Sequence, residues 1–171
     1  MPQSQPFCHM TPITDVTMMV LMTPDMANFS GNVHGGTILK FLDQVAYACA
    51  SRYSASYVVT LSVDQVTFKE PIHVGELVTF LARVNHVGKT SMEIGIRVEA
   101  ENIQNRIVRH TNSCYFTMVA VDENRVPTPA PELVLSDDVA IKRYHDAEKR
   151  KQLRLEAQRL KDEKVNKKKP K

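Results

Sequence analysis

The sequence has few of the residues that build disulfide frameworks or metal sites. Its 171 residues contain three cysteines, Cys8, Cys49 and Cys114, an odd number with no CxxC pair. A disulfide framework and a cysteine metal site are therefore not supported. The six histidines form no HxxxH or HExxH pair, so we expect no metal ion. The N-terminus lacks the basic-then-apolar order of a signal peptide, and no uncharged stretch is long enough to span a membrane. We therefore expect a cytoplasmic protein with no membrane partner.

Two common catalytic motifs are also absent. No GxSxG occurs, which argues against the nucleophile turn of a serine hydrolase. The triplet Gly88-Lys89-Thr90 resembles the end of a phosphate-binding loop. Arg83 stands where that motif requires its first glycine, so the match fails.

Charge is distributed unevenly along the chain. The formal net charge is +3, and 43% of the residues are hydrophobic, as in an ordinary globular domain. From residue 136 onward, thirteen Lys and Arg face seven Asp and Glu, so the rest of the chain is slightly acidic. A nucleic-acid-binding protein should have a basic face on its folded body, so we expect no nucleic-acid partner for the body. The basic tail either stays solvated or binds a membrane or nucleic acid, and we favour solvation.

Hydrophobic periodicity predicts one strand, one helix and four further strands. The third strand after the helix, at 92–100, alternates apolar and polar residues, which indicates one buried and one wet face. A change of parity in the first strand after the helix suggests a β-bulge near Asp64. The predicted elements are a strand at 13–22, a helix at 37–53 and strands at 57–68, 76–87, 92–100 and 107–121. This order predicts an α+β domain in which a curled antiparallel sheet of about five strands covers one long helix.

The C-terminal part begins with prolines. Three prolines between 126 and 131 exclude a helix and should prevent sheet pairing, so we predict a linker. Asp137 and Asp138 then offer an acidic start for a helix at 139–164. Its thin apolar stripe places it on a surface or against a partner subunit. We therefore divide the chain into an N-terminal tail (1–12), the domain (13–125), a linker (126–136) and a basic helix with a disordered end (137–171).

Asp43 is the most unusual charged residue. It is the only charge between Phe41 and Ser51 in an apolar helix. Burying an isolated carboxylate costs roughly several kcal/mol of folding free energy unless it is hydrogen-bonded. The position of Asp43 therefore needs an explanation. Asp43 either meets a local donor or solvent, or it acts as a general base or nucleophile.

The start of the same helix has the features of an oxyanion hole. His34 is followed by Gly35 and Gly36, which allow close approach of another group. Backbone amides in the first turn of a helix have no hydrogen-bond partner within the helix. They point outward at the positive end of the helix dipole. The pair is either a flexible helix cap or a site for developing negative charge. Asn28 in the preceding loop is a turn former or an amide ligand.

Several motifs resemble the acyl-coenzyme A thioesterases of the hotdog fold, most closely the cytosolic long-chain acyl-CoA hydrolase group. The motifs are PDMAN at 24–28, GNVHGGTILK at 31–40, Leu42-Asp43, SVDQVTF at 62–68 and PIHVGE at 71–76. They extend the likeness over about 11–121. The resemblance implies a hotdog domain that assembles as dimers, often three to a hexamer.

The resemblance also implies the chemistry. Asp43 becomes the catalytic carboxylate, and Asn28 of the neighbouring subunit orients water or thioester. The amides of Gly35 and Gly36 polarise the carbonyl. The reaction is hydrolysis of an acyl-CoA to fatty acid and coenzyme A, by activated water or through an anhydride on Asp43. Coenzyme A is part of the substrate, and no further cofactor is expected.

The expected places of four polar residues and two ring side chains in this domain suggest which of them bind the substrate. Coenzyme A is phosphorylated, and we expect its phosphates near Arg52 and the turn at Lys89, Thr90 and Ser91. These four residues are otherwise ordinary solvated groups. The acyl chain would pass Tyr47, and His34 would contact the substrate beside the glycine amides.

Two other functions use related features. A hotdog hydratase requires a catalytic histidine paired with an acid, whereas Leu42 and Gln44 flank Asp43. A non-catalytic acyl-CoA-binding module should lack Asp43 or Asn28, and both are present. Hydrolysis is the function that the sequence favours.

Overall fold

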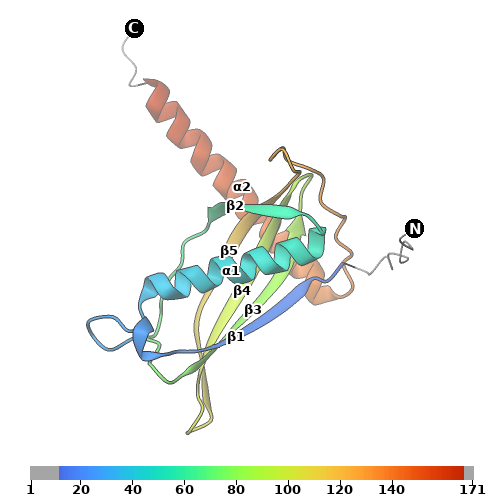
Figure 1. Cartoon of the computed structure of the whole chain (residues 1–171). Helices are drawn as coiled ribbons and strands as arrows, with labels where there is room; N and C mark the ends of the chain where they lie inside the picture. Colours follow the sequence, from blue (N-terminus) through green and yellow to red (C-terminus); the bar gives the residue numbers. More distant parts are fainter. Residues whose placement is uncertain (1–11, 168–171) are drawn as a thin grey trace.

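The structure is a computed structural model that describes residues 12–167, with side chains to residue 164. One antiparallel sheet and two helices make up the fold (Figure 1). In chain order the elements are β1 (Asp15–Leu21), the 3₁₀ turn η1 (Pro24–Met26), α1 (Gly35–Ser54), β2 (Tyr57–Val63), β3 (Leu77–Val87), β4 (Ser91–Asn102), β5 (Ile107–Val121) and α2 (Asp138–Lys167). The strand order is β1-β3-β4-β5-β2, so β1 and β2 are the two edges.

The sheet curls around α1, which confirms the predicted α+β hotdog architecture (Figure 1). The alternating residues of β4 account for this packing. Met92, Ile94, Ile96 and Val98 are all buried with the apolar side of α1. Their neighbours in β4 point to the opposite face, which we call the outer face. Because every second residue of β4 is apolar and buried, only one face of the sheet can pack on the helix.

Local signals set the ends of α1. His34 is its N-cap, with extended backbone and a ring nitrogen that accepts from the Gly36 amide. Ala55 ends the helix in the left-handed conformation. Between them, Leu42, Val45, Ala46 and Cys49 form a buried stripe at helical spacing. The small side chains bring the helix close to the sheet.

The first half of α2 packs on the outer face of the sheet. Asp137 caps it by accepting from the Ala140 amide at 2.8 Å, as the acidic start predicts. Ala147 is buried, and the ring of Tyr144 lies 4.7 Å from that of His86 in β3. The prediction that this helix lies on a surface is confirmed, and its far end extends away from the body (Figure 1).

The strand predicted at 57–68 is too long. Strand β2 ends at Val63, and the irregularity in its pairing with β5 falls between Thr60 and Ser62 rather than near Asp64. Asp64 still donates its amide to Tyr115, but its carboxylate turns to Arg154 of α2. Regular pairing therefore ends at Val63, and from Asp64 onward the chain contacts both β5 and α2.

The proline segment was wrongly expected to stay unpaired. Thr128 donates to the carbonyl of Ala120 at 2.9 Å, and Ala130 donates to that of Lys89 at 3.1 Å. These two residues alternate with the prolines and keep their amide hydrogens. The segment therefore follows the sheet even though its prolines cannot donate.

The predicted tails fall largely outside the described residues. Structure at 1–11 and 168–171 and side chains beyond 164 are not described, so the expected N-terminal tail and disordered lysine end remain predictions. Within the described part, neither helix is long and apolar enough to cross a membrane.

Candidate active site

Asp43 lies on the solvent side of α1 and not in the core. Its carboxylate is exposed in the single chain, which corrects the expectation of a buried acid. Thr60 of β2 donates its hydroxyl to Oδ1 of Asp43 at 2.7 Å. The apolar neighbours Leu42 and Val45 point inward, whereas Asp43 points outward on the same helix. The carboxylate is therefore held in place and open to a ligand.

Exposed apolar side chains lie on the same side of α1 as this carboxylate. Tyr47, one turn after Asp43, meets Tyr57 of β2 edge to face, with ring centroids 6.0 Å apart. Leu39, one turn before Asp43, is also exposed. We call Leu39, Tyr47 and Tyr57 the α1–β2 surface. Leu61 and Val63 are exposed too, but they line a hollow between β2 and α2. Exposed apolar groups beside an unpaired strand edge are typical of an interface with another chain.

The loop before α1 presents Asn28. Its side-chain oxygen accepts from the amides of Ser30 at 2.9 Å and Asn32 at 3.2 Å. Gly31 adopts a φ of 77°, which the tight turn needs. The side-chain NH₂ group of Asn28 makes no hydrogen bond within residues 12–167. The loop also holds Phe29 fully exposed at its tip.

The two glycine amides differ in their availability. Gly36 donates to Nδ1 of His34 at 3.0 Å, so that amide is occupied by the helix cap. Gly35 donates to no group in the part of the chain that the structure describes. Gly35 is thus the better placed donor for a carbonyl oxygen. Gly36 becomes available only when the imidazole turns away.

The remaining predicted residues lie at the other end of α1. Arg52 is exposed in the last turn, and 17 residues at a helical rise of 1.5 Å place it roughly 25 Å from Gly35. Lys89 and Thr90 lie in the β3–β4 turn, and Ser91 begins β4. Lys89 accepts from Ala130 of the proline segment, and Tyr53 near the same helix end donates to Pro131 of that segment. The structure brings Asp43, Tyr47 and Thr60 together. It places the glycine amides and Asn28 at one end of α1, and the basic groups at the other.

Thr60 is the residue that the sequence analysis missed. Threonine is common in strands, and its role depends on how β2 lies against α1. Val58 has the same parity and is buried against the helix, which places Thr60 on that side too. The position could be found only by pairing this strand with α1 in three dimensions.

The described cysteines are poor nucleophiles. Burial raises the pKa of the Cys49 and Cys114 thiols to about 12 each. Both remain protonated near neutral pH, so neither supplies a thiolate. No group of three His, Cys, Asp or Glu side chains gathers for a metal ion in the described part. The carboxylate of Asp43 is the accessible reactive group on this surface.

Comparison with known proteins agrees with this architecture. Residues 30–106 match the family model of the Thioesterase superfamily. Protein VdlD of Helicobacter pylori strain ATCC 700392 / 26695 is 55% identical over 141 residues, which cover 82% of this chain and 80% of that protein. A crystal structure of an apo-hexameric acyl-CoA thioesterase superposes with a TM-score of 0.81 at 33% identity, covering 84% of this chain and 92% of that one.

A second solved structure comes from Staphylococcus aureus. It is an acyl-CoA hydrolase in complex with butyryl coenzyme A, coenzyme A and coenzyme A disulfide. The TM-score is 0.80 at 27% identity, with 90% of this chain and 93% of that chain covered. Sequence, family model and fold agree, and the chain therefore belongs to the thioesterase superfamily.

Proposed function

We propose that this protein hydrolyses acyl-CoA thioesters to a carboxylic acid and coenzyme A. The observation that carries the proposal is the accessible Asp43 carboxylate, held by Thr60 on the apolar α1–β2 surface. A carboxylate there can reach a thioester, and the apolar side chains can cover an acyl chain. The relatives named as acyl-CoA hydrolases support the same reaction. We place the activity in the cytoplasm.

Asp43 acts in one of two ways. As a general base it takes a proton from water, whose oxygen attacks the thioester carbon while the C–S bond breaks. As a nucleophile its oxygen attacks that carbon directly, expels the thiolate and leaves an anhydride that water cleaves. Thr60 orients the carboxylate in both routes. The thiolate takes up a proton from solvent, and the chemistry needs no metal.

We infer that Asn28 of a partner subunit completes the site. Its free NH₂ group can donate to the water or the thioester, and Phe29 beside it is fully exposed on a projecting loop. The α1–β2 surface and the β2 edge are open to a second copy. A two-fold dimer would place each Asn28 loop on the other copy's surface and form two equivalent sites.

The other groups bind the substrate in this proposal. The Gly35 amide, with that of Gly36 once His34 turns away, would bind the carbonyl oxygen. The acyl chain would lie beside Tyr47. Arg52 and the turn at Lys89, Thr90 and Ser91 would hold the phosphates of coenzyme A.

Three dimers would assemble through the end of the outer face that lies away from α2. Met19 and Leu21 are exposed there on the β1 edge. One neighbour in fold is a hexamer, which supports a hexameric assembly.

Thiol release from acetyl-, octanoyl- and palmitoyl-CoA tests the function. The wild type should release thiol from at least one of them. Asp43→Asn should lower kcat by about 10²–10⁴-fold, the usual contribution of general acid–base catalysis. Asn28→Ala should lose a comparable factor while the oligomer stays intact. Asp162→Asn removes an exposed carboxylate on α2 and serves as the matched control.

Two outcomes would contradict the proposal. If the wild type binds acyl-CoA without releasing thiol, the protein is a binding module. If it hydrates an enoyl-CoA instead, the hydratase alternative holds and Asp43 has another role.

A further inference from the structure

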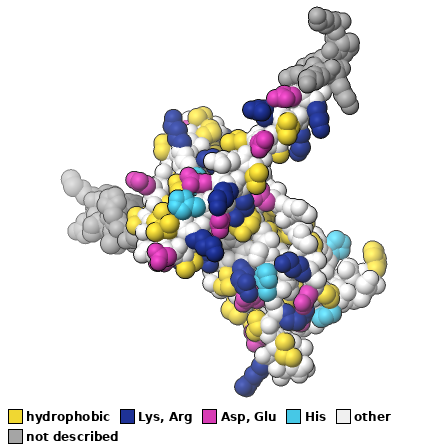
Figure 2. Space-filling model, turned by 180° about the vertical axis from the view of Figure 1, so that it is seen from behind, with side chains coloured by type: hydrophobic (Ala, Val, Ile, Leu, Met, Phe, Trp, Pro, Cys, Tyr) yellow, Lys and Arg dark blue, Asp and Glu magenta, His cyan; other side chains and the backbone are white. Residues whose placement is uncertain are grey.

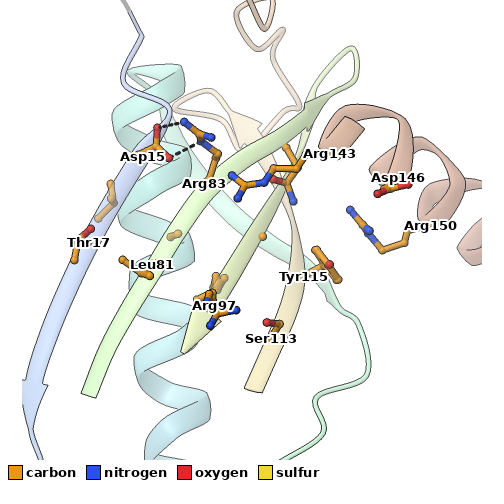
Figure 3. Close-up of a pocket in the computed structure, with 15 residues that line it drawn as sticks. Asp15, Thr17, Leu81, Arg83, Arg97, Ser113, Tyr115, Arg143, Asp146 and Arg150 are labelled. Carbon is orange, nitrogen blue, oxygen red and sulfur yellow. Dashed lines mark hydrogen bonds and ion pairs between the residues drawn. The ribbon is translucent and has the colours of Figure 1, made fainter. Parts of the chain in front are cut away.

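The outer face of the sheet contains a hollow that the proposed chemistry does not use. It measures about 390 Å³ and lies between β1, β3, β4, β5 and the first half of α2 (Figure 3). The sheet separates it from α1 and Asp43. Figure 2 views the molecule from this side and shows Lys and Arg side chains gathered over the middle of the face.

Four arginines and two aspartates line the hollow. Arg83 pairs with Asp15, Arg97 with Glu99, and Arg150 with Glu93. The fourth, Arg143, forms no ion pair within the described residues. It extends from α2 over the sheet, on the side of Arg83 (Figure 3). A guanidinium without a carboxylate partner is available for an anion from solution.

The side-chain amide of a largely buried residue faces the same hollow. Asn85 is the extra residue where the β3–β4 register shifts between Val84 and His86. It is 6% exposed and lines the hollow, yet its side chain makes no hydrogen bond among the described residues. The polar atoms of this amide face the hollow, where solvent reaches them in the absence of a ligand. The Asn85 NH₂ group is therefore free to donate to an acceptor that enters the hollow.

Gly95 of β4 makes room for this amide. A Cβ atom built on Gly95 would lie 2.3 Å from Nδ2 of Asn85, so any side chain there would displace the amide. Tyr115 and Ser113 provide hydroxyl groups on the neighbouring strand β5 (Figure 3). The Tyr115 ring is held under the guanidinium of Arg150, 3.7 Å from its centroid. The hollow thus presents hydrogen-bond donors from three strands and α2.

We propose that this hollow binds a phosphorylated small molecule, with Arg143 and the Asn85 amide as its main donors. Arg97 and Arg150 lie at its rim, where their charge is already compensated by Glu99 and Glu93. Phosphate oxygens accept several hydrogen bonds at once and favour arginine, which matches the donors present. The same phosphate chemistry could come from a free metabolite or from the nucleotide end of coenzyme A. We assign the site to a free metabolite because α1 and the sheet lie between it and Asp43.

Calorimetric titration of the full chain with pyrophosphate tests the site. The wild type should bind, with an affinity that falls as salt is added. Arg143→Glu and Asn85→Asp should each weaken binding at least about tenfold, because each places negative charge against the phosphate. Lys142→Glu makes the same charge change on the neighbouring exposed residue, outside the hollow, and should bind like the wild type.

The two sources of phosphate are separated by adding coenzyme A. If the site takes a free metabolite, coenzyme A leaves pyrophosphate binding unchanged, and Arg143→Glu keeps the wild-type KM for acyl-CoA. If coenzyme A displaces pyrophosphate and Arg143→Glu raises that KM, the assignment to a free metabolite is wrong.

The proposal fails if the wild type does not bind pyrophosphate, as it would if a second copy closes the hollow. It also fails if Lys142→Glu weakens binding as much as Arg143→Glu. Because Arg143 is exposed and bonds to no described group, its variant should fold normally. Equal circular dichroism spectra and gel-filtration profiles check this. Thiol release without added phosphate is a separate readout, so failure of this site and failure of the proposed hydrolase are distinguishable.

Discussion

Asp43 is the residue on which the proposed chemistry depends, and its surroundings explain how an exposed acid can be positioned. The Thr60 hydroxyl fixes one carboxylate oxygen and leaves the other free. Sequence reasoning could single out Asp43, because a lone charge in an apolar helix is conspicuous. It could not tell that the side chain points outward, since that depends on which helical face the sheet covers.

Replacing Thr60 tests this positioning. Thr60→Val removes the hydroxyl at nearly constant volume, so kcat should fall about tenfold, as expected for one lost hydrogen bond to a charged group. KM should change little, because Thr60 contacts the carboxylate and not the acyl chain in our proposal. Thr60→Ser restores a hydroxyl and should recover most of the rate. Steady-state thiol release measures both constants, and a wild-type kcat for Thr60→Val would contradict the assigned role.

His86 gives a prediction on stability. Burial, and secondarily the nearby Lys151, lower the pKa of its imidazole, while Glu148 and Glu93 act in the opposite direction. The folded state therefore favours the neutral ring. Stability is retained above the ordinary histidine pKa of about 6.5 and falls as pH drops below it, because the unfolded chain then binds the extra proton.

Melting temperatures of wild type and His86→Phe between pH 8 and 5 measure this effect. Phenylalanine keeps a ring against Tyr144 but cannot titrate. The wild type should lose more stability on acidification than the variant, and other histidines cancel in the difference. Parallel pH profiles for the two proteins would show that His86 does not contribute.

At the scale of elements, alternation along the strands predicts much of the fold. Strand β5 spans the predicted residues, and β4 extends the predicted 92–100 by one or two residues at each end. The sequence-based prediction is wrong where a contact between distant residues sets the end or the pairing of a segment. Strand β2 ends where the carboxylate of Asp64 meets Arg154 of α2, and the proline segment pairs through the residues between its prolines. Such long-range contacts leave no periodic signal in the sequence.

Helix α2 is fixed to the sheet by an ionic cluster. Glu93 of β4 is 3% exposed, and its carboxylate accepts from both Arg150 and Arg154 of α2. Arg154 also donates to Asp64 at 2.7 Å. Two arginines thus compensate one buried carboxylate and join the helix to two segments.

Glu93→Gln should lower the free energy of unfolding by up to about 3 kcal/mol, the low end for breaking a buried ion pair, because both arginines retain contact with water. Urea titration at fixed protein concentration, followed by circular dichroism, measures the change. Glu99→Gln breaks a surface pair with Arg97 on the same strand and should cost less than about 1 kcal/mol. Equal losses for the two variants would mean that the cluster does not anchor α2.

At the scale of the whole molecule, a single chain leaves its reactive surface incomplete. The Asn28 loop, the β2 edge and the α1–β2 surface are all open, and their apolar residues have no covering partner among the described residues. The resemblance of the Asn28 and Asp43 motifs implies sharing between subunits. The sequence cannot give the geometry of that sharing, because the geometry depends on how two folded edges meet.

Subunit mixing tests most directly the claim that Asn28 and Asp43 act across a dimer interface. Asn28→Ala and Asp43→Ala proteins, each inactive alone, are mixed and allowed to exchange subunits, with exchange verified by native mass spectrometry. A mixed dimer should contain one site with both residues intact, so random exchange should restore about a quarter of wild-type activity. If the mixture stays inactive after complete exchange, both residues act within one chain and the composite site is wrong.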